Sequence, residues 1–244
     1  MARLLTLDEA LFALLHRRSY RAAFLRGDTL ALHLGAEDRE DLATIDATQI
    51  ERSARRLAQS LFRRSHRGTG TLVDAFPATI EAWRRDHAGA PLDELAFEVF
   101  ESPHFERYRA LPFGPCGLSL EEVFFLFAED ARLGDPDTRN EEFVHAILKA
   151  LVVTPTPSFR VPARLKRAPQ GFFAVLPRGP RLVAAVSGRL ITGEITPFLA
   201  ALLTSSEPRG MIANRFGVGD AELSASLAEL ERLGLCNTNA DEND

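Results

Sequence analysis

Hydrophobic residues recur at helical spacing through the first 150 positions of the chain. Four segments have apolar residues three and four positions apart: Leu7, Leu11, Leu14 and Leu15; Ile50, Ala54, Leu57 and Leu61; Leu92, Leu95, Ala96 and Val99; and Phe143, Ile147 and Leu151. A fifth segment, Leu120 to Ala128, is too aromatic for a surface helix. Thr6 with Glu9 and Ser119 with Glu122 have the spacing of capping boxes, so we expect helices to begin there.

The pattern changes after residue 153. Four prolines within 154–170 forbid a regular helix and predict an extended linker. Three strand-like runs follow at 171–176, 181–186 and 189–192, with turn-forming residues between them. Three helical patterns then begin near Ile195, Pro208 and Asp220. We expect Asp220 to cap the last helix and Gly234 to end it.

These patterns predict a mainly α protein with a small α+β C-terminal domain. The expected order is a helical domain (1–153), a proline-rich linker (154–170), a winged-helix-like domain (171–236) and a polar tail (237–244). Within the third part the order of elements is β-β-β-α-α-α, because three strand patterns precede three helical ones.

Composition places the chain among soluble globular proteins. It has 45% hydrophobic residues, 26% charged residues and a net charge of −5. No apolar run approaches the ~20 residues that span a bilayer, and no signal-peptide cleavage site follows the first helix pattern. We therefore expect a cytoplasmic protein that does not insert into membranes. Cys116 and Cys236 have no ligand-like neighbours, which argues against a disulfide framework and a zinc motif.

The sequence contains no recognisable catalytic motif. None of its six histidines lies three or four residues from another, and HExxH, paired CxxC, GxSxG and nucleotide-binding glycine loops are absent. The pairs Glu121-Glu122 and Glu141-Glu142 are expected in the first turns of helices, where the helix dipole explains them better than acid-base catalysis does. We expect no catalytic residues, no metal site and no cofactor in this chain, and hence a protein that is not itself an enzyme.

The stretch RGMIANRFGVGDAELSASLAELERLGL resembles the last two helices of a helix-turn-helix, so a winged-helix transcriptional regulator that binds DNA is an alternative. The helix that would enter the groove carries four acids and one arginine, which are Asp220, Glu222, Glu229, Glu231 and Arg232. Acids facing phosphates oppose the charge neutralisation on which DNA binding depends. After Leu235, CNTNADEND leaves no room for a wing, so the pattern disfavours nucleic acid as a partner.

The same elements would also form a groove for an extended peptide, between the third strand and the third helix. Arg178, Arg181 and Arg189 would steer an acidic peptide to this groove, or would simply form a solvated face. The segment 51–67 has six arginines against Glu51. It predicts a basic amphipathic helix that either docks an acidic partner or a nucleic acid, or faces solvent.

Two parts of the chain resemble known families. The helical half contains LVDAFPATIEAW, FESPHFERY and GLSLEEVFFLFAE, and it resembles the MbnC-like accessory subunits of multinuclear non-haem iron oxidative enzymes. The C-terminal unit, about Gly171 to Leu235, looks like the PqqD-type element that recognises the leader of a ribosomally made precursor peptide.

The resemblance implies a non-catalytic subunit in natural-product biosynthesis. Its partner would be a TIM-barrel multinuclear non-haem iron oxidase, which carries the iron and forms a heterodimer with it. The precursor peptide would add to a strand formed by Arg189, Leu190, Ile191 and Thr192. It would also lie against small residues of the last helix, which are Ala221, Ser224, Ala225 and Ala228, around a buried stripe of Leu223, Leu227 and Leu230. The alternative is that these small residues are ordinary helix formers.

Overall fold

The computed structural model describes residues 4–28, 31–63, 70–110, 117–154 and 159–236. Its helical half consists of α1 (Leu7–His16), α2 (Arg18–Leu25), α3 (Ala36–Ala43), α4 (Ala47–Arg63), α5 (Leu72–Ala75), α6 (Pro77–Asp86), α7 (Leu92–Phe100), α8 (Pro103–Ala110), α9 (Leu120–Asp130) and α10 (Pro136–Val153). The remainder consists of β1 (Lys166–Ala168), β2 (Gly171–Leu176), β3 (Arg181–Val186), β4 (Arg189–Glu194), α11 (Pro197–Thr204), α12 (Arg209–Phe216) and α13 (Asp220–Arg232). The protein is therefore mainly helical, with a small sheet followed by helices, as predicted.

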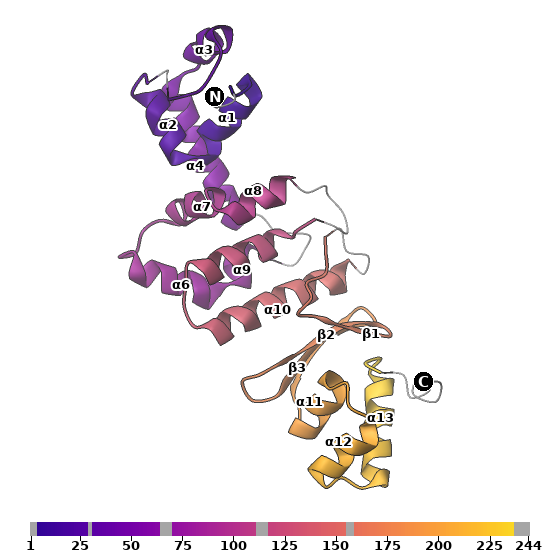
Figure 1. Cartoon of the computed structure of the whole chain (residues 1–244). Coiled ribbons are helices and arrows are strands. Elements are labelled where there is room, and N and C mark those ends of the chain that lie inside the picture. The colour runs from indigo at the N-terminus through magenta and orange to yellow at the C-terminus, as the bar shows by residue number, and fades with distance from the viewer. Residues whose placement is uncertain (1–3, 29–30, 64–69, 111–116, 155–158, 237–244) are drawn as a thin grey trace.

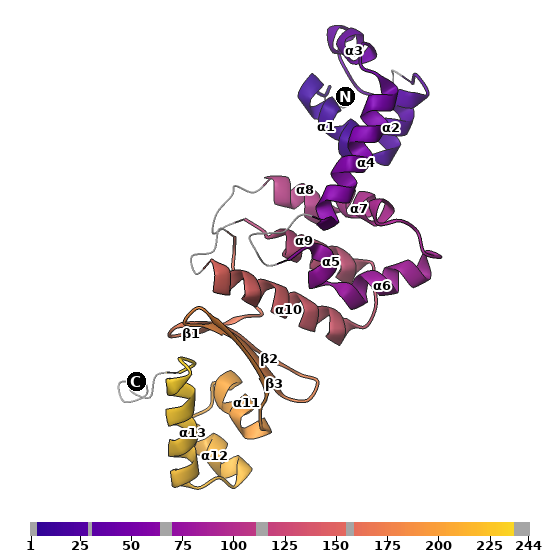
Figure 2. The same ribbon diagram turned by 180° about the vertical axis from the view of Figure 1, so that it is seen from behind.

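The elements follow one another along an elongated molecule. Helices α1 to α3 lie at one end, α6 to α10 form the middle, and the sheet with α11 to α13 forms the other end (Figure 1). The long helix α4 runs from the first group into the second, which is clear from the opposite side (Figure 2). Among the described residues, no helix is both long and apolar enough to cross a membrane.

The first group has a small core of its own. Ala10 and Leu14 of α1 pack with Leu34, Leu42 and Ile50. The expected capping box at its start is confirmed: the Thr6 hydroxyl accepts from the Glu9 backbone N–H, and the Glu9 carboxylate accepts from the Thr6 backbone N–H. This box fixes the first turn of α1 by satisfying two backbone donors that the helix cannot pair internally.

The central core is built around α9, whose aromatic block is buried as expected. Phe124 is fully buried and contacts the rings of Phe62, Phe76 and Phe127. The prediction of a capping box at Ser119 needs correction. The Ser119 hydroxyl accepts from the backbone N–H of Glu122, but the Glu122 carboxylate accepts a hydrogen bond from Arg160. A distant arginine thus binds the carboxylate that the local motif would have used.

The sheet differs from the prediction by one strand. All four strands pair antiparallel in the order β1-β2-β3-β4, and the additional strand, β1, lies in the segment predicted to be a linker. Its sequence, Lys-Arg-Ala, has no apolar alternation, so pairing with β2 through the turn at Pro169 and Gln170 creates it. At Gly171 an added Cβ would lie 1.9 Å from the Ala185 carbonyl oxygen, so glycine is required for this approach.

Each face of the sheet packs on helices. Ala174, Val183 and Ala185 belong to the core that contains α9 and α10, whereas Phe173 and Ala184 belong to a separate core with α11 and α13. Alternation along a strand sends neighbouring side chains to opposite faces, so one short sheet serves both cores. Figures 1 and 2 show the resulting layers, with α10 on one side of the sheet and α11 to α13 on the other.

The three C-terminal helices have close to the expected bounds, but the expected cap is wrong. Helix α13 begins at Asp220 itself, and its N-cap is Gly219, which has no side chain to accept a hydrogen bond. Gly217 ends α12 in the left-handed conformation, with a φ of 67°. The turn before α13 therefore depends on glycine backbone conformation more than on a capping side chain.

Candidate peptide-binding surface

The predicted peptide-binding strand lies at an edge of the sheet. β4 pairs with β3 alone among the described strands, with Arg189 opposite Val186 and Thr192 opposite Val183. Arg189 and Thr192 are exposed, whereas Leu190 is half-buried on the side of α10 and Ile191 is half-buried against the core of α11 and α13. The outer edge of β4 therefore presents backbone groups that no other described strand pairs.

The predicted helical wall lies on α13. Ala221, Ser224, Ala225 and Ala228 recur at three- and four-residue spacing on one face, and all four are exposed. The expected buried stripe beneath them needs correction. Leu230 is buried, but Leu223 and Leu227 are only half-buried, and Leu223 packs on a separate small cluster with Phe198 and Ile212.

The two predicted groups belong to one structural unit without forming one continuous patch. Ile191 of β4 and Leu230 of α13 belong to the same hydrophobic core. The four small residues of α13 stand outside that core on the exposed side of the helix. The shared core places strand and helix in fixed relation, and the exposed face of α13 stays accessible.

Two of the three arginines predicted to attract an acidic peptide form ion pairs with carboxylates of the same chain. Arg178 forms ion pairs with Asp135 and Asp137 near the start of α10, and Arg181 lies 2.7 Å from Glu141. Arg189 alone of the three has no ion pair among the described residues. Two of the three predicted charges are therefore paired at the protein surface, and Arg189 on β4 is the one without an ion pair among the described residues.

The ion pairs of the basic segment explain its composition. The stretch 159–189 has many arginines and no carboxylate, and its arginines also reach acids of α9: Arg160 pairs with Glu122 and Arg164 with Glu129. At Asp135 the carboxyl pKa is held below its ordinary value, first by the Thr138 backbone N–H, then by the Thr138 hydroxyl, with Arg178 contributing less. The basic segment thus attaches the sheet to the acidic faces of α9 and α10.

The helix that would enter a DNA groove remains acidic in the folded protein. Asp220, Glu222, Glu229 and Glu231 are exposed, and Arg232 is 2.5 Å from Glu229. The Arg232 hydrogen bond is the main cause that lowers the pKa of the Glu229 carboxyl. This surface repels phosphate.

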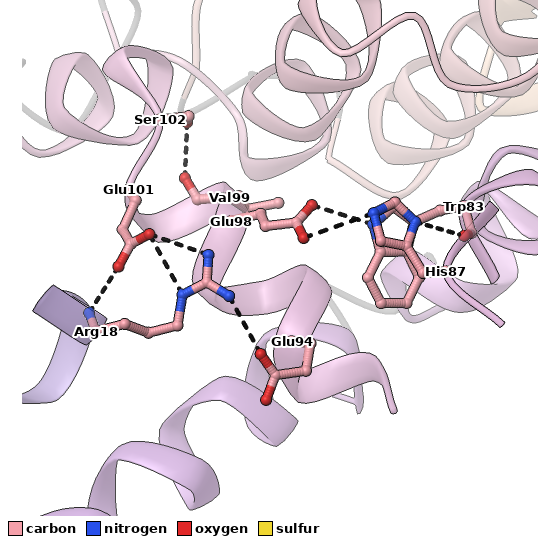
Figure 3. Close-up of polar contacts among 8 residues, drawn as sticks. All are labelled: Arg18, Trp83, His87, Glu94, Glu98, Val99, Glu101 and Ser102. Carbon is pink, nitrogen blue, oxygen red and sulfur yellow. Dashed lines mark hydrogen bonds and ion pairs between the residues drawn. The ribbon is translucent and has the colours of Figure 1, made fainter. Parts of the chain in front are cut away.

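Polar groups in the helical half connect helices to one another (Figure 3). Arg18 of α2 lies 3.2 Å from Glu94 of α7 and 3.1 Å from Glu101, the residue that caps the C-terminus of α7. Burial opposes the charge of Arg18, but the hydrogen bonds to these two carboxylates outweigh it and raise the pKa of the guanidinium. Figure 3 shows this network at the junction of α2 and α7, where it positions the two helices.

A second carboxylate of α7 binds two aromatic residues of the α6 region. Glu98 accepts from the Trp83 indole N–H at 3.1 Å and lies 4.0 Å from His87, whose ring stacks on Trp83 (Figure 3). Ser102 donates to the Val99 carbonyl, so its hydroxyl is already engaged. No set of three or more His, Cys, Asp or Glu side chains within the described ranges is arranged to hold a metal.

The basic segment 51–67 falls partly outside the described residues, which end at Arg63 of α4 and resume at residue 70. Arg52, Arg55 and Arg56 are exposed on the polar face of α4, and Arg55 pairs with Glu51 on the next turn. Ala54 and Ala58 are fully buried on the opposite face. The described part of this segment is thus the amphipathic helix that its pattern predicted.

One polar site escaped sequence reasoning. Glu121 and Glu141, assigned to helix first turns, together line a cavity that also holds His145. Glu141 and Glu142 lie beyond the first turn of α10, which begins at Pro136. The prediction that they interact with the dipole of their own helix was therefore wrong. Their spacing carries no signal of the cavity, because its walls come from segments far apart in the chain.

Comparison of the chain with protein-family models, with curated proteins and with solved structures finds no match. Arguments about function therefore rest on the geometry of the chain itself.

Proposed function

We propose that this chain is a non-catalytic partner protein that binds a ribosomally made precursor peptide and presents it to an iron-dependent oxidase. The peptide adds in extended form to the outer edge of β4, and a further part of it lies on the exposed small residues of α13, which form a separate patch on the same unit. The single observation that carries the proposal is that β4 is an edge strand on the unit whose last helix exposes a small-residue face.

An extended peptide on β4 would gain its affinity from main-chain hydrogen bonds, which any sequence can make. Specificity would come from side chains that alternate along the peptide, half of them pointing toward the helical layer. Exposed strand edges in natural proteins are usually protected. The exposed Arg189 and Glu194 offer some charge protection on β4, and an added peptide would complete the pairing.

The helical half serves in this proposal as the docking surface for a TIM-barrel multinuclear non-haem iron oxidase. The iron is carried by that partner, and the two chains form a heterodimer. The ion pairs between the sheet and α10, such as Arg181 with Glu141, fix the peptide-binding unit relative to the helical half. A bound peptide would then be held at a set position relative to the oxidase.

The proposal is tested by co-expression and by peptide binding. The chain is co-expressed with a barrel-type iron oxidase from the same genome, and the complex is measured by size-exclusion chromatography. Fluorescence anisotropy with a labelled peptide from a neighbouring short reading frame measures recognition. Arg189→Glu should weaken peptide binding about tenfold or more, because it places a carboxylate beside an acidic peptide.

Arg52→Glu is the matched control, since it makes the same charge reversal at an exposed site on α4. It should leave peptide affinity unchanged. Failure to form a complex would overturn the role as an oxidase partner, and equal effects of the two variants would overturn β4 as the binding edge. A salt-dependent gel shift with duplex DNA, lost in Arg215→Ala, would instead support the transcriptional regulator.

A further inference from the structure

A cavity of about 400 Å³ lies in the helical half, away from β4 and α13. Its walls come from the start of α6 with the adjoining α5, the first turn of α9, and the middle of α10. The lining contains four carboxylates, those of Asp74, Glu121, Glu141 and Glu142, together with His145 and Lys149. The cavity is therefore acidic, and the question is which of its charges the protein itself neutralises.

Contacts within the protein account for three of the four carboxylates. Glu142 accepts from the backbone N–H groups of Ala78 and Thr79, at 2.6 and 3.2 Å, and so caps the start of α6. Glu141 pairs with Arg181 of β3 at 2.7 Å. These two acids are bound from outside the cavity, one by a helix terminus and one by the sheet.

Asp74 is the third carboxylate that has partners. It accepts from the Thr71 backbone N–H and hydroxyl at 2.8 Å, and these contacts are the main cause that lowers the pKa of its carboxyl. The ammonium group of Lys149 adds a smaller attraction to the same carboxylate. Lys149, the one cationic side chain among the described residues that line the cavity, thus acts on Asp74 from a distance and forms no ion pair with a described carboxylate.

Glu121 differs from the other three. Its residue is only 7% exposed, it lines the cavity, and it has no hydrogen bond or ion pair with any described residue. It lies in the first turn of α9. Its carboxylate oxygens are not among the buried unpaired atoms of the described residues, so the carboxylate faces the cavity, where a cation can reach it.

The remaining lining indicates the chemistry of that cation. Ala75, Pro77 and Ala146 contribute apolar surface beside Glu121. The Nδ1–H of His145 donates to the Glu141 carbonyl, so Nε2 of the neutral ring is an acceptor. Carboxylate and imidazole acceptors next to hydrocarbon fit an alkylammonium group. The described residues offer no cluster of three ligands for a metal ion.

We propose that this cavity binds a small organic cation, a primary ammonium on an apolar body, with Glu121 as its counter-ion. The volume suits a ligand well above the size of water and below that of a nucleotide. One positive charge suffices, because among the described residues three of the four carboxylates have a partner and Glu121 has none. This site is separate from the peptide-binding edge and does not depend on the proposed function.

The test uses the full chain and the probe 2-phenylethylammonium, with neutral 2-phenylethanol as its isostere. Binding is measured by protein-observed NMR titration. Nα-acetyl-lysine methylamide, which keeps its side-chain ammonium, serves as a second probe. We expect saturable binding of the ammonium probe, at least about tenfold weaker binding of the alcohol, and shifts at cavity residues. Tighter binding of the lysine derivative would identify a peptide side chain as the natural source of the ammonium.

Glu121→Gln keeps the shape of the side chain and removes its charge. It should lower the affinity for the ammonium probe at least about tenfold. Glu222→Gln is the matched control, because Glu222 is also in the first turn of a helix but is exposed on α13. A second variant, Ala75→Leu, should abolish binding by filling the cavity while the charge remains. Equal affinity for amine and alcohol, unchanged binding in Glu121→Gln, or no saturation would overturn the proposal.

Discussion

Helices α9 and α13 have similar first turns but differ in how much of each helix is buried. Both carry two acids in the first turn and several leucines or other apolar residues after them. Eight residues of α9 are buried, including both acids, whereas α13 buries Leu230 alone. The apolar residues of α9 surround the helix, and those of α13 form one narrow side. Helix α9 therefore organises a core, and α13 retains a face on which another molecule can bind.

The largest expected effect follows from this difference in burial. Phe124→Ala should lower the free energy of unfolding by about 3–5 kcal/mol, because it leaves a cavity among Phe62, Phe76 and Phe127. Leu227→Ala on α13 should cost about 1 kcal/mol, because Leu227 is only half-buried. Urea unfolding followed by circular dichroism measures both values. Equal losses would show that α13 is packed as tightly as α9.

Two arginines, one paired with a buried glutamate of α9 and one with an exposed glutamate of α13, test whether ion pairs of the two helices differ in stability. Arg160 and Arg232 each lie 2.5 Å from a glutamate, but Glu122 is buried on α9 and Glu229 is exposed on α13. Arg160→Ala should lower the free energy of unfolding by about 1–3 kcal/mol, because Glu122, which already has one unpaired buried oxygen, loses its partner. Arg232→Ala should cause no measurable change. Similar results for the two variants would refute the contrast.

The helical half and the C-terminal unit should also differ in how their stability depends on pH, because all six histidines precede residue 146. Burial is the main cause that lowers the pKa of His16, with Arg109 and Arg17 adding repulsion and the Phe12 carbonyl and Glu106 opposing them. The unfolded chain then binds the proton more readily than the folded one. Stability should fall as the pH drops from about 6.5 toward the lowered pKa, and His16 should have no effect above that window.

Urea unfolding across this pH range measures the effect. His16→Phe keeps an aromatic ring beside Phe12, Phe100 and Phe105. This variant should lose the part of the pH dependence of the unfolding free energy, the slope, that His16 causes. The control is His33→Asn, at an exposed residue with a φ of 53° that asparagine tolerates. It should leave the slope intact. A slope that persists in His16→Phe would assign it to another group.

The smallest expected effect on stability lies on the exposed face of α13. Ala225→Glu should change the free energy of unfolding by less than about 0.5 kcal/mol, because the side chain points to solvent. Under the proposed function it should still lower the affinity for the labelled peptide, because it adds bulk and charge to the exposed face of α13. Thermal unfolding and peptide anisotropy on the same sample separate the two effects. A large loss of stability would show that this face is covered within the protein.

Much of the local structure was predictable from short-range patterns. The capping box of Thr6 and Glu9, the three main strands and the three last helices depend on residues within a few positions of one another. The candidate binding residues fell where the pattern placed them, on an edge strand and on an exposed helix face. Their role in peptide binding stays a prediction.

Errors arose where partners lie far apart in the chain. Ser119 and Glu122 have the spacing of a capping box, but Arg160, 38 residues later, binds Glu122. Glu142 caps a helix 63 and 64 residues before it, at Thr79 and Ala78. Strand β1 has no apolar pattern and exists because β2 lies beside it. Spacing rules do not contain such contacts, because each depends on how separate elements dock.

The amino-acid sequence by itself determined where helices and strands form and which side of each is apolar. Periodicity and capping act within a few residues, so they need no knowledge of the rest of the chain. Only the tertiary structure decided, for the described residues, which charges are neutralised, which edge of the sheet has no neighbouring strand and which carboxylate has no partner. Those outcomes depend on burial and on distances between segments, and these are properties of the packed molecule. The basic segment shows the difference, because the sequence alone does not assign partners to its arginines, and in the fold Arg160, Arg164, Arg178 and Arg181 form ion pairs with acids of α9 and of the α10 region.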